Sequence, residues 1–189
     1  MDRVLVVIFG LMGVGKTTVA RALAEARGWP VIHSDAVRKA LAGLAPTTPA
    51  RFEFGHGIYS EDFSQKTYKE MRRRAGELLD GGTIRVILDA SFKSVQERDQ
   101  VRELAREKEA RVVFVYCFCP QKVVRERLLK RADNASAISD GRLELLDLQV
   151  EDFEPLTEAD QPLLRLDTGR ELEQVLQDVN EFLDGLLVQ

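Results

Sequence analysis

The chain of 189 residues (21.3 kDa) has a formal net charge of -4, a pI near 5.4, 44% hydrophobic and 31% charged residues, which is typical of one globular domain rather than a disordered chain. The acidic balance disfavours nucleic acid as a partner without excluding it. The apolar start from Val4 to Phe9 is too short for a membrane span and lacks a signal-peptide cleavage pattern, so we expect a cytoplasmic protein with no membrane partner.

The run from Gly10 to Thr17 matches G-x-x-x-x-G-K-[ST] at every fixed position and directly follows the apolar stretch. Its glycines let the backbone curl, so that successive N–H groups form an anion nest at the start of a helix. Lys16 then reaches the β- and γ-phosphates, and the Thr17 hydroxyl is placed to ligate Mg²⁺. We predict that a nucleoside triphosphate is held by Gly13, Val14, Gly15, Lys16, Thr17 and Thr18.

Apolar runs and amphipathic helical segments alternate along the chain, which is typical of a parallel sheet covered by helices on both faces. The predicted strands are Val4–Phe9, Pro30–His33, Ile84–Leu88, Val112–Phe118 and Leu163–Leu166. The predicted helices are Lys16–Arg27, Ser34–Leu41, Ser60–Leu79, Val95–Glu109, Gln121–Arg131, Arg142–Asp152 and Glu171–Leu187. We therefore expect an α/β fold of three layers, in which Cys117 and Cys119 share a strand face and serve packing.

Carboxylates follow two of the predicted strands. Asp35 comes just after the second strand, where open α/β sheets place ligand groups, and could deprotonate an acceptor hydroxyl; its alternative role is a helix N-cap. Asp89 ends the third strand as a Walker B aspartate does, and could hold Mg²⁺ or bind the acceptor; its alternative role is a turn residue. No glutamate follows Asp89, which argues against a motor-type ATPase.

Arginines lie where they could stabilise the charge of a transferring phosphoryl group. Arg127 and Arg131 are four residues apart and share a helix face at the entrance to a presumed lid. Arg38 follows Asp35 by one helical turn, and Arg98 lies early in the helix after Asp89. For each of them the alternative is a solvated surface role.

The stretch 43–57 contains prolines and glycines without a steady period, so it is a loop long enough to be functional. His56 in this loop and Tyr59 just after it are candidates to contact substrate. Because neither histidine has Cys or carboxylate partners at ligand spacing, the only metal expected is Mg²⁺ carried with the nucleotide. The small polar stretch 132–141, between two helical segments, is typical of a mobile lid.

Four motifs follow one another along the chain in an order that resembles a known family. They are Gly10 to Thr17, then Ser34-Asp35-Ala-Val-Arg38-Lys39, then Val86-Ile-Leu-Asp89-Ala-Ser-Phe92, then Cys119-Pro120 leading to Arg127-x-x-x-Arg131. Nearly the whole chain resembles the P-loop kinases of the adenylate-kinase-like group, nearest to the AAA-type ATP-binding domains often fused to aminoglycoside-phosphotransferase-like domains. Gluconate kinase, polynucleotide 5'-hydroxyl kinase and zeta-toxin kinases are similar more distantly.

The resemblance implies a P-loop NTPase fold with a five-stranded parallel sheet in the order 2-3-1-4-5, as a single domain over residues 1–189. It implies an acceptor-site loop and helix over residues 43–80 and a helical lid over residues 125–145. It also implies ATP with Mg²⁺, Asp35 as the base, and Arg127 and Arg131 as lid arginines. Because the related ATP-binding domains are often fused to an aminoglycoside-phosphotransferase-like domain, we also expect a kinase-like partner domain that acts in trans.

We therefore expect an ATP-dependent phosphotransferase that moves the γ-phosphoryl group of Mg-ATP to a hydroxyl of a small molecule. This hypothesis assigns catalytic roles to Lys16, Asp35, Arg127 and Arg131. It assigns binding of the metal to Thr17 and Asp89. The acceptor is bound by Asp35, Arg38, His56, Tyr59, Asp89 and Arg98. Two alternatives stay open: a kinase of polynucleotide 5'-hydroxyl ends or nucleotide sugars, and a nucleotide-dependent switch acting through a partner. Adenine and guanine both stay open as the base, since no base-reading motif such as N-K-x-D is present, and ATP is taken as the default nucleotide.

Overall fold

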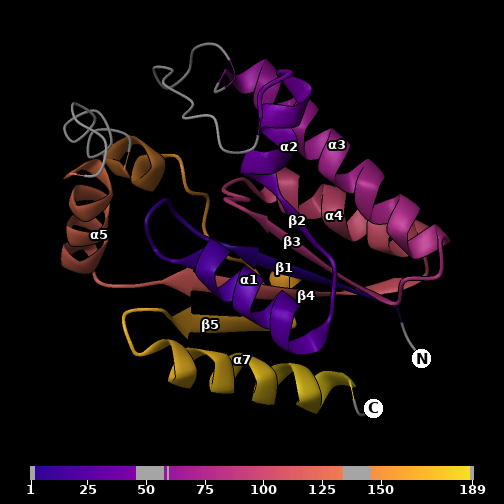
Figure 1. Ribbon diagram of the computed structural model, residues 1–189. Helices are drawn as coiled ribbons and strands as arrows, with labels where there is room; N and C mark the ends of the chain where they lie inside the picture. The colour runs from indigo at the N-terminus through magenta and orange to yellow at the C-terminus, as the bar shows by residue number, and fades with distance from the viewer. Residues whose placement is uncertain (1–2, 46–57, 59, 134–145, 188–189) are drawn as a thin grey trace.

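The computed structural model describes residues 3–45, 58, 60–133 and 146–187 (Figure 1). Its five strands form one parallel sheet in the order β2-β3-β1-β4-β5, which confirms the predicted fold class and strand order. The strands are β1 (Arg3–Phe9), β2 (Val31–His33), β3 (Arg85–Ala90), β4 (Ala110–Phe118) and β5 (Leu163–Asp167).

Helices cover both faces of this sheet (Figure 1). They are α1 (Lys16–Arg27), α2 (Ser34–Leu41), α3 (Glu61–Asp80), α4 (Val95–Glu107), α5 (Gln121–Asp133) and α7 (Leu172–Leu187). Residues 146–151 are also helical, and a short 3₁₀ turn spans Glu158–Asp160. Within the described ranges, no helix has the length and apolar composition needed to cross a membrane.

The two faces of β1 show why a continuous apolar strand is required here. Every residue from Val4 to Phe9 is fully buried. Val4, Val6 and Ile8 pack with α1 and α7, whereas Leu5, Val7 and Phe9 pack with α3 and α4. Because a central parallel strand is covered on both sides, neither set of alternating side chains can be polar.

The helix ends follow local chemistry. Gly28 ends α1 in the left-handed conformation, with a φ of 65°. The Ser60 hydroxyl accepts from the amide of Phe63 at the start of α3, and Ser94 and Glu97 form a capping box at the start of α4. The helix predicted to reach Glu109 ends earlier, because the backbone turns there with a φ of 50° and enters β4 at Ala110.

The strand register brings three chain segments together at one edge of the sheet. The carboxyl ends of the strands point to the left in Figure 1. At that edge Asp89 of β3 lies between its partners Ile8 of β1 and His33 of β2. Parallel sheets of this type bind ligands at the carboxyl ends of their strands, so the candidate site lies there.

Candidate active site

Asp89 stands at the centre of this edge. Its side chain is buried, and Oδ2 accepts a hydrogen bond from the Thr17 hydroxyl at 2.8 Å and one from His33 Nδ1 at 2.7 Å. Its other oxygen, Oδ1, is buried without a hydrogen-bond partner among the described residues. A buried carboxylate oxygen left unpaired is costly, so this arrangement prepares Oδ1 for a ligand.

The unpaired Oδ1 of Asp89 and the nearby Thr17 hydroxyl suit the Mg²⁺ that the phosphate loop implies. Mg²⁺ prefers oxygen ligands and keeps several waters, using one or two carboxylates together with substrate phosphates. The Thr17 hydroxyl and Oδ1 of Asp89 supply such oxygens side by side, and they fit the ion. Elsewhere in the described ranges, no group of three or more His, Cys, Asp or Glu side chains could hold a metal.

The phosphate loop follows β1 and depends on its glycines. Gly10, Gly13 and Gly15 have φ values of 145°, 77° and 101°, which other residues rarely adopt. A Cβ on Gly10 would also lie 2.3 Å from the carbonyl oxygen of Cys117. Gly15 is the N-cap of α1 and supplies no side-chain cap, so the first amides of α1 remain available to an anion.

Other segments hold the loop in place. Arg127 of α5 donates from Nη1 to the carbonyl of Val14 at 3.0 Å and from Nη2 to the carbonyl of Thr168 at 2.7 Å. The Thr168 hydroxyl also donates to the Val14 carbonyl. Lys16 folds back onto the carbonyl of Leu11 at 3.1 Å. The loop is therefore tied to α5 and to the segment after β5 before any nucleotide binds.

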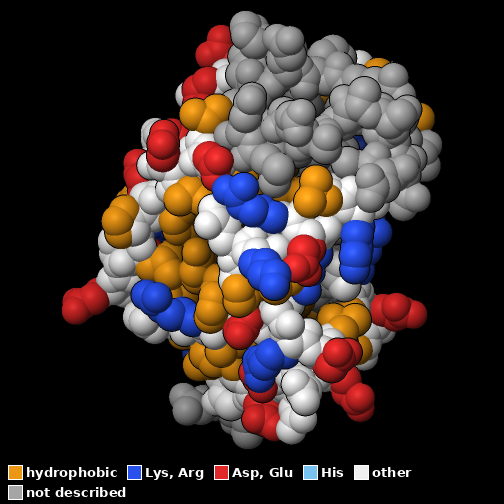
Figure 2. Space-filling view, turned by 90° about the vertical axis from the view of Figure 1, so that its left-hand side faces the viewer, with side chains coloured by type: hydrophobic (Ala, Val, Ile, Leu, Met, Phe, Trp, Pro, Cys, Tyr) orange, Lys and Arg blue, Asp and Glu red, His pale blue; other side chains and the backbone are white. Residues whose placement is uncertain are grey.

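A cavity of about 330 Å³ opens beside the first turn of α1. It is lined by Gly15, Thr18, Val19, Arg127, Lys130, Thr168, Arg170, Leu172 and Val175. Figure 2 looks onto this edge of the molecule, and Lys and Arg side chains gather across the middle of the face. The cavity is thus a partly basic recess that continues directly from the phosphate loop.

Asp35 and Arg38 lie on the other side of the site, in α2. Asp35 is 59% exposed and pairs with Lys39 at 2.7 Å. It is not the N-cap of α2, because that position belongs to His33. Arg38 is buried and donates to the carbonyl of Ile58 and, at 3.2 Å, to the hydroxyl of Ser64. Asp35 is therefore open to a substrate, whereas Arg38 connects α2 to α3.

Arg98 requires a correction. We expected it to contact substrate, but its side chain is fully buried. It donates to Asp160 Oδ1 at 3.0 Å, to the Phe92 carbonyl at 3.0 Å and to the Pro155 carbonyl at 2.9 Å. Because all three guanidinium nitrogens are used inside the protein, Arg98 joins the loop after β3 to the segment before β5.

Replacing Arg98 by methionine should lower the free energy of unfolding by about 3 kcal/mol, because Asp160 would lose a buried partner. Asp160 would still accept from Arg102, which keeps the loss at the lower end of the range for buried pairs. Urea denaturation would measure it. The control is Arg125→Met, which removes the exposed pair with Asp147 and should cost less than about 1 kcal/mol. Equal losses in both variants would refute the structural role of Arg98.

Several predicted residues cannot be placed in the site. His56 and Tyr59 lie outside the described residues, and so does the side chain of Arg131. Most of the expected loop 43–57 and the tip of the expected lid also lie outside them. Arg127 reaches the phosphate loop, as its helix position suggested, but its guanidinium holds backbone carbonyls there. A catalytic role for Arg127 stays a prediction.

The structure adds two residues that sequence reasoning missed. His33 donates to Asp89 from the neighbouring strand, and the Gln149 side chain accepts from the backbone amide of Met12 at 3.0 Å. His33 directly precedes Ser34-Asp35, so the strand register was the signal that would have paired it with Asp89. Nothing local in the sequence marks Gln149, which is 137 residues from its partner.

Comparisons with known proteins give the following matches. A family model described as an AAA domain matches residues 5–156. An uncharacterized protein of Mycobacterium tuberculosis is 33% identical over 132 residues, covering 70% of this chain and 26% of that protein. A shikimate kinase of Rhodopseudomonas palustris is 31% identical over 135 residues, covering 68% of this chain and 56% of the kinase. The chain therefore spans only part of each relative.

Among solved structures, a gluconokinase from Sinorhizobium meliloti superposes with a TM-score of 0.67 at 22% identity. The superposition covers 98% of this chain and 93% of the gluconokinase chain. At this identity the likeness establishes a common fold.

Proposed function

Because the chain belongs to the AAA-domain family whose model matches most of it, and has the fold of the P-loop kinases, we propose that it transfers the γ-phosphoryl group of ATP to a hydroxyl of a small-molecule acceptor. The resemblance to P-loop kinases seen in the sequence is confirmed at the level of family and fold. Activity and substrate are the proposal.

The observation that carries the proposal is the pairing of Thr17 with Asp89 at the end of the phosphate loop, with one oxygen of Asp89 left unpaired. Thr17 and Asp89 would hold Mg²⁺. When bound, the ion neutralises charge on the phosphates. Lys16 would exchange its contact with the Leu11 carbonyl for the β- and γ-phosphates, and the amides at the start of α1 would surround them.

The nucleoside would occupy the cavity beside α1. Its volume of about 330 Å³ suits a group of this size. The cavity shares Gly15 and Thr18 with the nucleotide-binding run, so a triphosphate in the loop leads directly into it. Arg127, Lys130 and Arg170 line the cavity and would face the phosphates or the sugar.

Asp35 is proposed as the base. Its exposed carboxylate stands in the first turn of α2, two residues beyond His33, which contacts Asp89. It would take the proton of the acceptor hydroxyl while the acceptor oxygen bonds to the γ-phosphorus and ADP departs with the bridging oxygen. The pair with Lys39 keeps the carboxylate close to the helix. The acceptor would lie against α2 and the region 43–80, under a lid over residues 125–145.

A small acceptor is supported by the relatives, which include a shikimate kinase and a gluconokinase. Both are named for small hydroxylated acids. The net charge of -4 also disfavours a polynucleotide. The relative from Mycobacterium tuberculosis is much longer than this chain, so a partner domain supplied in trans belongs to the proposal as well.

The test is ADP formation from Mg-ATP in the presence of hydroxylated carboxylic acids, sugars, nucleosides, aminoglycosides, nucleotide sugars or 5'-hydroxyl oligonucleotides. We expect at least one small acceptor to raise the rate well above that of ATP alone, and Lys16→Ala to abolish this increase. If ATP binds and no acceptor changes the rate, the proposed transfer is contradicted and a nucleotide-dependent switch is favoured instead.

A further inference from the structure

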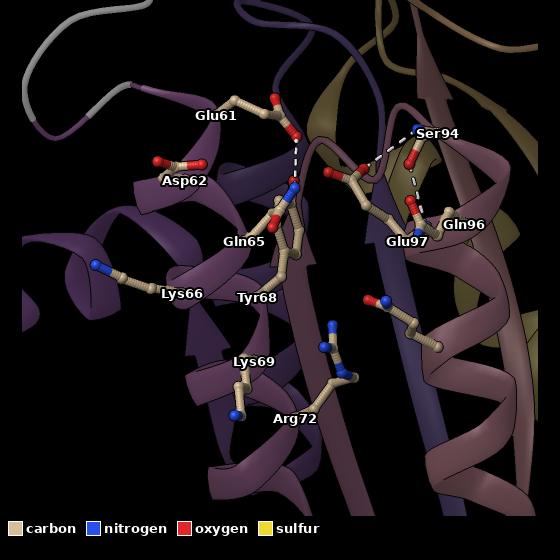
Figure 3. Close-up of a pocket in the computed structure, with 11 residues that line it drawn as sticks. Glu61, Asp62, Gln65, Lys66, Tyr68, Lys69, Arg72, Ser94, Gln96 and Glu97 are labelled. Atoms are coloured by element: carbon tan, nitrogen blue, oxygen red, sulfur yellow. Dashed lines mark hydrogen bonds between the residues drawn. The ribbon is translucent and has the colours of Figure 1, made fainter.

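A second recess lies between α3 and α4, on the sheet face opposite α1 and α7 (Figure 3). Its volume is about 430 Å³, and the described residues that line it belong to 61–72 of α3 and 94–100 at the start of α4. We call it the α3–α4 groove. Among the described residues it shares none with the cavity beside the phosphate loop, so it is distinct from the cavity proposed for the nucleoside.

The inner wall of the groove contacts the loop that follows Asp89. Tyr68 is buried at this wall, and its hydroxyl bonds to the Ser91 hydroxyl at 2.8 Å and accepts from the Phe92 amide at 3.2 Å. Ser91 and Phe92 follow Asp89 along the chain. The Tyr68 hydroxyl is thus bonded to the loop after β3, and the groups that could contact a ligand in the groove are mainly charged side chains.

One end of the groove is basic. The guanidinium of Arg72 points into the space between the two helices (Figure 3), and its Nη1 is buried without a hydrogen-bond partner among the described residues. Burial lowers the pKa of Arg72, and the nearby charges of Glu103 and Glu97 offset only part of that effect. Lys69 lies one turn earlier on α3 and also lines the groove.

The guanidinium of the neighbouring Arg73, unlike that of Arg72, is exposed and paired. Arg73 donates to Glu70 at 2.7 Å and also pairs with Glu77. A buried guanidinium nitrogen without a partner costs more than such an exposed pair gains. A group that accepts hydrogen bonds from Arg72 would therefore be strongly favoured in the groove.

The other end of the groove is acidic. Glu97 is held in place there, because its carboxylate accepts from the Ser94 amide at 3.2 Å within the capping box of α4. Glu61 and Asp62 lie across from it at the start of α3 (Figure 3). A ligand that crosses the groove would meet positive charge at one end and carboxylates at the other.

We propose that the α3–α4 groove binds a small anionic molecule whose carboxylate or phosphate group accepts hydrogen bonds from Arg72 and Lys69. Hydroxyl or ammonium groups of the same molecule would donate toward Glu97. The volume of about 430 Å³ admits a compact metabolite. Charge-assisted hydrogen bonds to a partly buried guanidinium are stronger than hydrogen bonds between neutral groups. Arg72 would therefore be the main determinant of binding.

The test is an NMR titration of ¹⁵N-labelled full chain, with Mg²⁺ and a non-hydrolysable ATP analogue present so that the phosphate loop is filled. The probes are inorganic phosphate, glycerol 3-phosphate and malate, which separate phosphate from carboxylate recognition. We expect amide shifts within residues 65–72 and 96–100 for at least one probe, with no comparable shifts at Gly13 or Gly15. Arg72→Gln should weaken that probe about tenfold or more, and Arg73→Gln should bind it as the wild type does.

The proposal is overturned if no probe shifts these amides at about 10 mM, where even a Kd near the millimolar range would be detected. It is equally overturned if Arg72→Gln binds as tightly as the wild type. The amide spectrum of each variant checks its fold. If Arg72→Gln does not fold, Lys69→Gln must show the loss of affinity instead, and unchanged binding in that variant would refute the site.

Discussion

Replacing Asp89 by asparagine is expected to lower kcat/KM for ATP by about 10²–10³, the usual cost of removing one transition-state stabiliser. The substitution removes the negative charge next to Thr17 and directs an amide group toward one of the two positions that the carboxylate oxygens occupy. Steady-state rates over a range of Mg²⁺ concentrations would measure it. The Mg²⁺ concentration for half-maximal rate should rise in the variant.

The matched control is Asp99→Asn, because Asp99 is an exposed carboxylate on α4 that pairs only with Arg102 among the described residues. It should leave kcat/KM within about twofold of the wild type, as surface substitutions usually do. If Asp89→Asn behaves like this control at all Mg²⁺ concentrations, Asp89 is not the metal-binding residue.

The second large effect is expected from Asp35→Asn. Loss of a general base costs about 10²–10⁴ in rate, so kcat should fall by that factor while the Kd for Mg-ATP stays unchanged. Single-turnover transfer at saturating acceptor, combined with calorimetric titration of the nucleotide, separates the two quantities. Near-normal transfer would remove Asp35 from the mechanism.

Lys39→Gln distinguishes a base from a structural ion pair. This variant removes the partner of Asp35, at 2.7 Å, but keeps the carboxylate itself. If Asp35 acts as the base, Lys39→Gln should retain most of the activity that Asp35→Asn loses. If the pair only holds α2 in place, the two variants should be impaired alike.

The features that the sequence predicts best are those fixed by neighbours in the chain. The phosphate loop needs glycine where φ is positive, and it needs lysine and threonine at the start of the helix. All of these residues are close together in the chain, so the sequence alone predicts the loop. The apolar run of β1 likewise predicts a central strand, because both of its faces are buried. Asp89 could be found because it lies at the carboxyl end of such a strand, one residue before the last residue of β3.

The features that sequence reasoning missed depend on distant partners. The sequence around Arg98 does not show that its side chain is buried, because its partner Asp160 lies 62 residues later in the chain. His33 gains its role only when β2 is aligned with β3, which places it beside Asp89. The orphaned nitrogen of Arg72 arises from the packing of α3 against α4. The helical period places Arg72 on the same side of α3 as the buried Tyr68 and Ala75, but it does not show that one guanidinium nitrogen stays unpaired.

The measurement that tests the central claim most directly is the fate of the γ-phosphoryl group, followed by ³¹P NMR with an acceptor that accelerates ADP formation. We predict that the ATP signals are replaced by those of ADP and of a phosphate monoester in equal amounts, and that Asp35→Asn suppresses the monoester. ADP accompanied only by inorganic phosphate, with every acceptor, would contradict transfer to a hydroxyl and identify the protein as a nucleotide hydrolase.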